Sequence, residues 1–111
     1  MEITDKTIYL LLKEIGVPTG LKGYKYIKKA IQLYAKNPDS KITAVYSDIA
    51  LAFADKPSRV ERAIRHAVTR TFDNIKCETA EKFFGNWDYR KSQPANKQFF
   101  ASIVEYLKYN G

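Results

Sequence analysis

The sequence has very few of the residues from which catalytic and metal sites are usually built. Its 111 residues include one cysteine, Cys77, and one histidine, His66, and no motif surrounds either of them. A single cysteine excludes an internal disulfide, which fits a reducing cytoplasm. One histidine and one cysteine are also too few for a nucleophile with its base or for a metal centre. The sequence therefore predicts no enzyme, no metal site and no bound cofactor.

Long hydrophobic runs are missing as well. The longest strongly apolar run, "IYLLL", covers only residues 8–12, whereas a membrane-spanning helix needs about 20 apolar residues. The chain opens with no secretory signal pattern. It also contains no internal repeat, low-complexity tract or long linker, and its length fits one domain, residues 1–111. We expect a single cytoplasmic domain that does not enter a membrane.

Positive charge is abundant, and much of it is concentrated in one segment. Nineteen lysines and arginines against twelve acids give a formal net charge of +7, which favours a polyanionic partner. Hydrophobic residues still make up 45% of the chain, enough for a packed core. The segment "PSRVERAIRHAVTR", residues 57–70, carries four of the five arginines, the histidine and a single acid. We expect this segment to form the main binding surface.

Apolar residues recur with the period of an α-helix, and no run alternates convincingly like a strand. Three apolar stripes predict helices. The first helix has Thr4 or Asp5 as its cap and Gly16 at its end, and Ser47 is an alternative start for the third. The stripes are Ile8, Leu11, Leu12 and Ile15; Tyr24, Ile27, Ile31 and Tyr34; and Ile42, Val45, Ile49 and Phe53. Further helices are expected at residues 58–72, 78–84 and 95–109, the last with Phe99, Phe100, Ile103, Val104 and Leu107 facing inward. The predicted fold class is all-α, a compact bundle of about six helices.

The arginine-rich helix has two distinct sides on a helical wheel. The apolar stripe comprises Val60, Ile64, Ala67 and Thr71, with Ala63 and Val68 at its margins. The opposite side comprises Arg62, Arg65, His66 and Thr69, flanked by Arg59, Arg70 and Glu61. We therefore expect a small aliphatic side that packs on the core and a nearly uniform cationic side that faces outward.

Together with the preceding helix and the short turn "ADKP", this helix predicts a helix-turn-helix at about residues 47–72. Ile49 and Phe53 would pack on Val60 and Ile64, and the small Ala50 would let the two helices approach closely. In such a unit the second helix enters the major groove of DNA, with its first residues against base edges.

Residues in the first turns of this helix suit the reading of bases. Arg59 and Arg62 can each bind guanine O6 and N7 with two hydrogen bonds, and Glu61 can accept a hydrogen bond from cytosine N4. Arg65 and His66, one turn later, are expected to meet phosphates or the edge of the groove. The first hypothesis is therefore sequence-specific binding of double-stranded DNA.

Simpler roles compete for the same residues. Ser58 and Glu61 have the spacing of a capping box, in which Glu61 would bond the amide of Ser58. Glu61 also precedes Arg65 by four residues, the favourable order for a surface ion pair of about 0.3–0.5 kcal/mol. The second hypothesis is a non-catalytic protein-interaction module whose basic helix docks on an acidic protein and binds DNA only electrostatically. A membrane-surface helix fits less well because the apolar side is small.

The motif "SRVERAIRHAV", residues 58–68, resembles the recognition helix in the C-terminal DNA-binding effector domain of the sporulation initiation response regulator, the stage-zero sporulation protein A family. "IGVPTGLKGYKYIKKAI", residues 15–31, is similar to the opening helices of that family. "KITAVYSDIALAF", residues 41–53, resembles the first helix of its helix-turn-helix. The resemblance extends over residues 8–107.

The resemblance implies a six-helix, winged-helix-like domain without a wing, which regulates transcription and reads a DNA box of the TGTCGAA kind. It implies Arg59, Glu61 and Arg62 as base readers, and Ser58, Arg65 and His66 as backbone or accessory contacts. The turn "ADKP" departs from the family's usual threonines, and Lys56 is expected to add a phosphate contact there.

The resemblance also implies contacts with proteins. A dimer on tandem boxes would use the last helix, and an RNA polymerase sigma factor would contact the segment between Asn74 and Phe84. The family's regulator carries a receiver domain with a phospho-acceptor aspartate, for which 111 residues leave no room. A complete protein of this length would be a constitutive binder, a competitor or antagonist at the same boxes, or a partner of another regulator.

Overall fold

The structure of the chain is a computed structural model that describes residues 3–85 and 92–110. In these residues the regular structure consists of six helices and no strand. The helices are α1 (Asp5–Ile15), α2 (Lys22–Lys36), α3 (Ile42–Ala52), α4 (Pro57–Asn74), α5 (Cys77–Phe84) and α6 (Asn96–Asn110). The all-α fold predicted from the helical period is confirmed.

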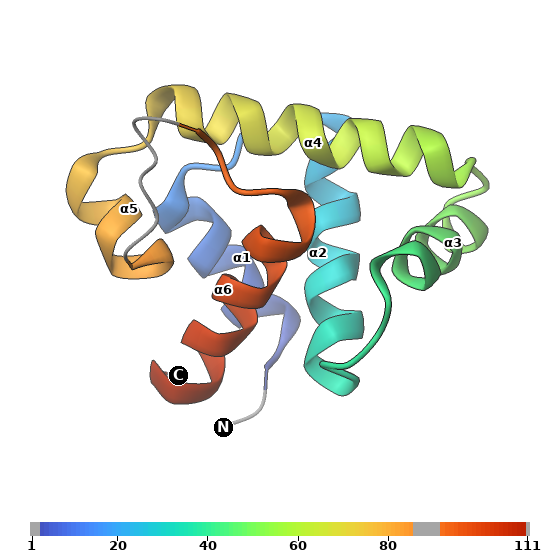
Figure 1. Cartoon of the computed structure of the whole chain (residues 1–111), viewed down its shortest axis with the longest axis horizontal. Helices are drawn as coiled ribbons and strands as arrows, with labels where there is room; N and C mark the ends of the chain where they lie inside the picture. The colour runs from blue at the N-terminus through green and yellow to red at the C-terminus, as the bar shows by residue number, and fades with distance from the viewer. Residues whose placement is uncertain (1–2, 86–91, 111) are drawn as a thin grey trace.

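Helix α4 lies along one side of the molecule, with α3 beside its start and α5 beside its end (Figure 1). Helix α2 is the central element, because it packs against α1, α3, α4 and α6. Helix α6 in turn packs against α2, α4 and α5. The arginine-rich helix is therefore supported from below by α2 and α6 and at its two ends by α3 and α5.

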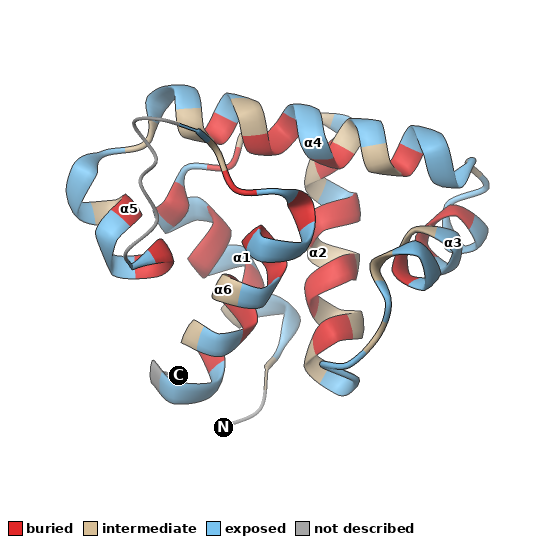
Figure 2. Cartoon of the chain, in the orientation of Figure 1, coloured by how far each residue is buried: buried red, intermediate tan, exposed pale blue. Residues whose placement is uncertain are grey.

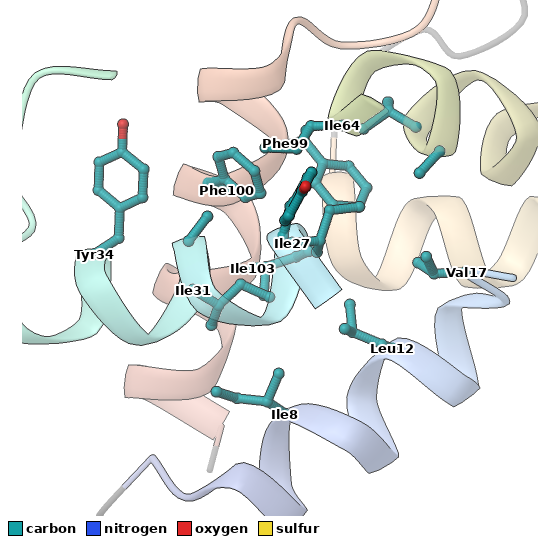
Figure 3. Packing of buried hydrophobic residues seen from close by; sticks show 14 of the residues in the cluster. Ile8, Leu12, Val17, Ile27, Ile31, Tyr34, Ile64, Phe99, Phe100 and Ile103 are labelled. Atoms are coloured by element: carbon teal, nitrogen blue, oxygen red, sulfur yellow. The ribbon is translucent and has the colours of Figure 1, made fainter. Parts of the chain in front are cut away.

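The predicted apolar stripes form the core. Buried residues line the inner sides of the helices, while their outer sides are exposed (Figure 2). The five positions predicted to face inward on α6 are all buried. Side chains of α6, such as Phe99 and Ile103, meet side chains of α2, such as Ile27 (Figure 3). Burying one large aliphatic or aromatic side chain contributes about 1.5–3 kcal/mol, so this shared core holds the helices together.

Helix α1 begins and ends at predicted residues. The Thr4 hydroxyl oxygen accepts a hydrogen bond from the Thr7 amide at 3.2 Å, a cap that typically contributes about 1 kcal/mol. At the other end Gly16 has φ 97°, and its amide donates to the Leu12 carbonyl. This left-handed conformation favours glycine. Local sequence signals therefore place both ends of this helix.

Three details of α2 and α3 differ from the expectation. Helix α3 is unbroken, because the Ser47 hydroxyl donates to the Thr43 carbonyl at 3.1 Å instead of starting a new helix. Phe53 is 37% exposed and its ring lies 5.3 Å from that of Tyr26, between centroids. Tyr26 itself is 1% exposed, although the predicted stripe contained Tyr24, which is half-buried.

None of the helices in residues 3–85 and 92–110 has a stretch long and apolar enough to cross a bilayer.

Candidate nucleic-acid interface

Helix α4 has the buried side that the wheel predicted. Val60, Ile64, Ala67 and Val68 are completely buried, and Thr71 nearly so. The Thr71 hydroxyl donates to the Ala67 carbonyl at 2.7 Å, which satisfies the one buried polar group of this stripe. The apolar side is small, yet it fixes the rotation of α4 about its axis.

A glycine allows α4 to lie directly on α2. A Cβ atom added to Gly23 would lie 2.2 Å from the Ala63 carbonyl oxygen and 2.9 Å from the Ala67 Cβ. Real Cβ atoms do not approach other atoms so closely, so α2 and α4 can pack at this distance only with glycine at this position. Sequence reasoning missed Gly23, because a glycine in the first turn of a helix gives no sign of which helix it will touch.

The predicted site residues lie together on the outer side of α4 or directly before it. Lys56, Ser58, Arg59, Arg62, Arg65 and His66 are exposed, and Glu61 is partly buried. The outer side of α4 is mostly exposed (Figure 2). All four arginines of the helix are exposed, so none is folded under a neighbouring helix. Within the described residues, the arginines of this helix make one ion pair, between Arg65 Nη1 and Glu61 Oε1 at 3.6 Å. The other guanidinium groups are therefore available to an anionic partner.

The capping box predicted from Ser58 and Glu61 is wrong. Helix α4 begins at Pro57, one residue before the predicted range of 58–72. Its N-cap residue is Lys56 rather than Ser58, and the side chain of Lys56 makes no capping hydrogen bond. Proline suits the first helical position because its φ is already helical and it has no amide hydrogen to satisfy. Ser58 therefore lies inside the first turn, and Glu61 forms the ion pair with Arg65 instead, as the alternative interpretation predicted.

Asp55, in the turn before α4, joins three parts of the molecule. Its Oδ1 atom accepts a hydrogen bond from the Lys56 amide at 2.8 Å. Its Oδ2 atom accepts one from the Tyr26 hydroxyl at 2.5 Å and lies 3.0 Å from Lys22 Nζ. The carboxylate is well covered, with 7% of the side chain exposed. Sequence reasoning missed this cluster because Asp55 and Tyr26 are 29 residues apart.

The electrostatics of this cluster follow from its hydrogen bonds. The Tyr26 hydroxyl, the Lys56 amide and Lys22, in that order of importance, hold the pKa of Asp55 far below its usual range. Burial, together with the hydrogen bond to Asp55, raises the pKa of Tyr26 to about 12. At neutral pH the carboxylate is therefore charged and the phenol keeps its proton, so each is in the state that the hydrogen bond requires.

The turn also contains a strained residue. Ala54 has φ 53°, in the left-handed region that favours glycine, and the Asp55 amide donates to the Ala50 carbonyl at 2.9 Å. This is the geometry of a Schellman motif, which ends a helix sharply. A residue other than glycine in this conformation costs roughly 1–2 kcal/mol. The contacts of Asp55 help to hold the turn in spite of that cost.

The start of α6 supports the same face of the molecule. The buried Asn96 side chain donates to the Tyr46 hydroxyl of α3 at 2.9 Å and to the Glu61 carbonyl of α4 at 3.3 Å. A shallow hollow of about 430 Å³ lies beside these residues and is also lined by Arg65. Three helices are thus joined by one amide group directly behind the arginine-bearing surface.

The sequence of residues 8–107 matches the family described as "Sporulation initiation factor Spo0A C terminal". The match covers nearly the whole chain, over the same residues as the resemblance noted from the motifs. Domains of this family are regulatory rather than catalytic, and they bind double-stranded DNA. The chain therefore belongs to the sporulation initiation factor Spo0A C-terminal family and is a DNA-binding effector domain of a sporulation regulator.

Proposed function

We propose that this domain binds DNA sequence-specifically, with α4 in the major groove as the second helix of a helix-turn-helix formed with α3. The observation that carries the proposal is the division of α4 into two sides. One side is buried on α2 and α6, and the other exposes Arg59, Arg62, Arg65 and His66. A major groove about 12 Å wide admits a helix presented in this way, and a buried stripe keeps the helix from rotating.

The base readers in this proposal are Arg59, Glu61 and Arg62. Arginine binds guanine through two hydrogen bonds, and glutamate accepts one from cytosine, so this set suits a box of the TGTCGAA kind. The ion pair between Glu61 and Arg65 is long, at 3.6 Å, and lies at the surface, so it is weak and a base can replace it. Lys56, Ser58, Arg65 and His66 supply backbone or accessory contacts, which give affinity and orientation rather than sequence discrimination.

The test compares one duplex that contains a TGTCGAA box with a scrambled duplex of the same composition. Fluorescence anisotropy at about 150 mM salt should show a preference of at least about 10³ for the box. Arg62→Ala should weaken binding to the box by about 1–3 kcal/mol and relax the preference at one base pair. The matched control is Arg70→Ala, an exposed arginine later on the same helix. Its removal should lower both affinities slightly and by similar factors.

Two results would contradict this assignment. An equal loss on both duplexes for Arg62→Ala would remove Arg62 from the base readers. A wild-type domain without a preference would leave a purely electrostatic DNA binder and would favour the protein-interaction module instead.

We also propose α6 as the contact between two copies on tandem boxes. The support is an exposed surface at the end of this helix, where Tyr109 is 80% exposed. Beside it lies a hollow of about 250 Å³ between α2 and α6, lined by Tyr34 and Val104 among others. Tighter binding to a duplex with two boxes than to two separate boxes would support this contact, and equal binding would argue against it.

The sigma-factor contact is proposed for the segment between Asn74 and Phe84, which includes α5. Its support is the family resemblance and a surface that exposes charges of both signs: Lys76, Glu78, Glu81 and Lys82. A mixed surface of this kind suits a protein partner better than a polyanion. Pull-down with a purified sigma factor, compared between the wild type and Glu81→Lys, would test it.

A further inference from the structure

Asp55 is not among the residues proposed to touch DNA, but its carboxylate binds Lys22, Tyr26 and the amide of Lys56 at the start of α4. Lys22 and Tyr26 are four residues apart and therefore lie on one face of α2. Both reach the same oxygen of Asp55, while the other oxygen receives the amide of Lys56. The carboxylate thus fastens the turn before α4 to the central helix of the bundle.

The second fastening point lies on the other side of the base readers. Gly23 brings the backbone of α2 against Ala63, one turn after Arg59 along α4. Asp55 is four residues before Arg59, and Ala63 is four residues after it. The residues proposed to read bases, Arg59, Glu61 and Arg62, therefore all lie between two points at which α4 is held by the same helix, α2.

We propose that Asp55 is a positioning residue for DNA recognition, which with the Gly23–Ala63 contact fixes both ends of the segment that carries Arg59, Glu61 and Arg62. The proposal rests on the function proposed above and adds a specificity-determining residue that touches no base. Discrimination between base pairs requires side chains held within about 0.5 Å of their productive positions. A helix start that can pivot about Gly23 no longer satisfies this requirement.

The charge of Asp55 gives the proposal a distinctive signature. A carboxylate near a phosphate backbone opposes binding to any duplex, so its removal should raise the affinity for scrambled DNA. Loss of positioning should lower the affinity for the box. A residue that only stabilises the fold would not separate the two affinities while the domain remains folded.

The experiment measures both affinities by fluorescence anisotropy for Asp55→Asn, well below its unfolding midpoint as determined by circular dichroism. The matched control is Asp48→Asn, which removes the same charge from an exposed position on α3. We expect both variants to bind scrambled DNA slightly more tightly than the wild type. Only Asp55→Asn should bind the box more weakly, by about tenfold.

Tyr26→Phe provides a second, independent variant. It removes one hydrogen bond to Asp55 but keeps the buried ring and every charge, so scrambled DNA should bind unchanged and the box several-fold more weakly. It decides the question alone if Asp55→Asn does not fold. In the double variant the losses should not add, because both changes disrupt the same hydrogen bond.

The outcomes separate the two proposals. If the wild type prefers the box and both variants keep that preference, the positioning role is wrong and the proposed function stands. If the wild type has no preference, the proposed function is wrong and the positioning role falls with it. A reduced preference in Asp55→Asn and Tyr26→Phe, but not in Asp48→Asn, supports the positioning role.

Discussion

The two ends of α4 are held in different ways. Its start is fixed by directional polar contacts at Asp55 and by a backbone contact at Gly23. Its end is held by ring packing: the centroids of Phe72 and Phe84 are 5.0 Å apart, and those of Phe84 and Phe99 are 5.5 Å apart. Hydrogen bonds fix direction, whereas apolar packing tolerates changes of similar volume. The start of α4 therefore sets where its arginines point, and the end mainly sets how stable the domain is.

The two ends of α4 also differ in the charges that they expose. Over residues 56–65 the exposed charged side chains, Lys56, Arg59, Arg62 and Arg65, are all cationic, and at α5 the exposed charges have both signs. A uniform positive surface suits a polyanion, whereas a mixed surface suits another protein. The comparison predicts that substitutions near the start change DNA discrimination, and that substitutions in the apolar packing near the end change stability without changing DNA discrimination.

The largest expected effect tests the stabilising role of the end. Phe84→Ala removes a buried ring that packs on Phe72 and Phe99 and leaves a cavity. We expect the free energy of unfolding to fall by about 3–5 kcal/mol, measured by urea denaturation. Below the new midpoint, the preference for the box over scrambled DNA should be unchanged. The control is Tyr109→Ala, which removes an exposed ring and should cost little.

The comparison would fail if the folded Phe84→Ala variant lost its preference for the box. Such a result would mean that the aromatic cluster also orients the arginines at the far end of α4.

The next effect tests the start of α4 and combines stability with discrimination. In Gly23→Ala the new methyl group would collide with the Ala63 carbonyl, so the two helices must separate. Overpacking typically costs about 1–3 kcal/mol, and a backbone collision belongs at the upper end, above the gain of about 1 kcal/mol in helix propensity. We expect a net loss of stability in urea denaturation and a reduced preference for the box.

Gly20→Ala is the matched control for this variant, because a Cβ atom added there meets no atom within 4 Å. It should leave both stability and discrimination close to those of the wild type. A Gly23→Ala variant that is as stable and as selective as Gly20→Ala would contradict the assigned role of the contact.

The sequence predicts the helices well because their signals are local. The stripes of residues 8–15 and 99–107 mark buried sides, and the arginine segment predicts both sides of α4. The local signals fail where two of them compete. Ser47 bonds to the preceding turn rather than capping, and α4 already begins at Pro57, which leaves Ser58 inside the helix and not at its cap.

The contacts that position the candidate site are not visible in the sequence. Tyr26 and Asp55 meet across 29 residues, and Gly23 touches Ala63 across 40 residues. Neither pair has a characteristic spacing, because their meeting depends on how α2 and α4 cross. Periodicity identifies which side of a helix is buried but does not identify the residue against which it is buried.

A smaller effect, of opposite sign, tests the strained turn at the start of α4. Ala54→Gly replaces alanine at φ 53° with the residue that adopts this conformation without strain. Relief of roughly 1–2 kcal/mol of strain, less the extra flexibility of the unfolded chain, should raise the free energy of unfolding by about 0.5–1 kcal/mol. Thermal unfolding measures the change.

The matched control is Ala44→Gly, the same substitution at an exposed position within α3. It should lower the free energy of unfolding by about 1 kcal/mol, so the two variants should move in opposite directions. A loss of stability in both would mean that the left-handed conformation of Ala54 does not carry the assigned strain.

The smallest expected effect comes from the more exposed of two lysine–carboxylate ion pairs. Lys22 and Asp55 are 3.0 Å apart around a covered carboxylate, whereas Lys82 and Glu14, which join α5 to α1, are 2.6 Å apart with both side chains about half exposed. Solvent and salt screen the second pair, so Glu14→Gln should change stability less than Phe84→Ala, Gly23→Ala or Ala54→Gly and leave DNA discrimination unaffected.

The pH dependence identifies that small contribution. The hydrogen bond to Glu14 raises the pKa of Lys82, so the contribution of the pair is complete below the pKa of an unfolded lysine, about 10.4, and is lost as the pH rises through the higher folded value. Urea denaturation of the wild type and Glu14→Gln should therefore differ at neutral pH and converge in strong alkali. The difference should also shrink in high salt. If the free energies of unfolding of the wild type and Glu14→Gln still differ in strong alkali and in high salt, Glu14 acts through packing. Exposure would then not explain why this pair contributes less than the covered pair at Asp55.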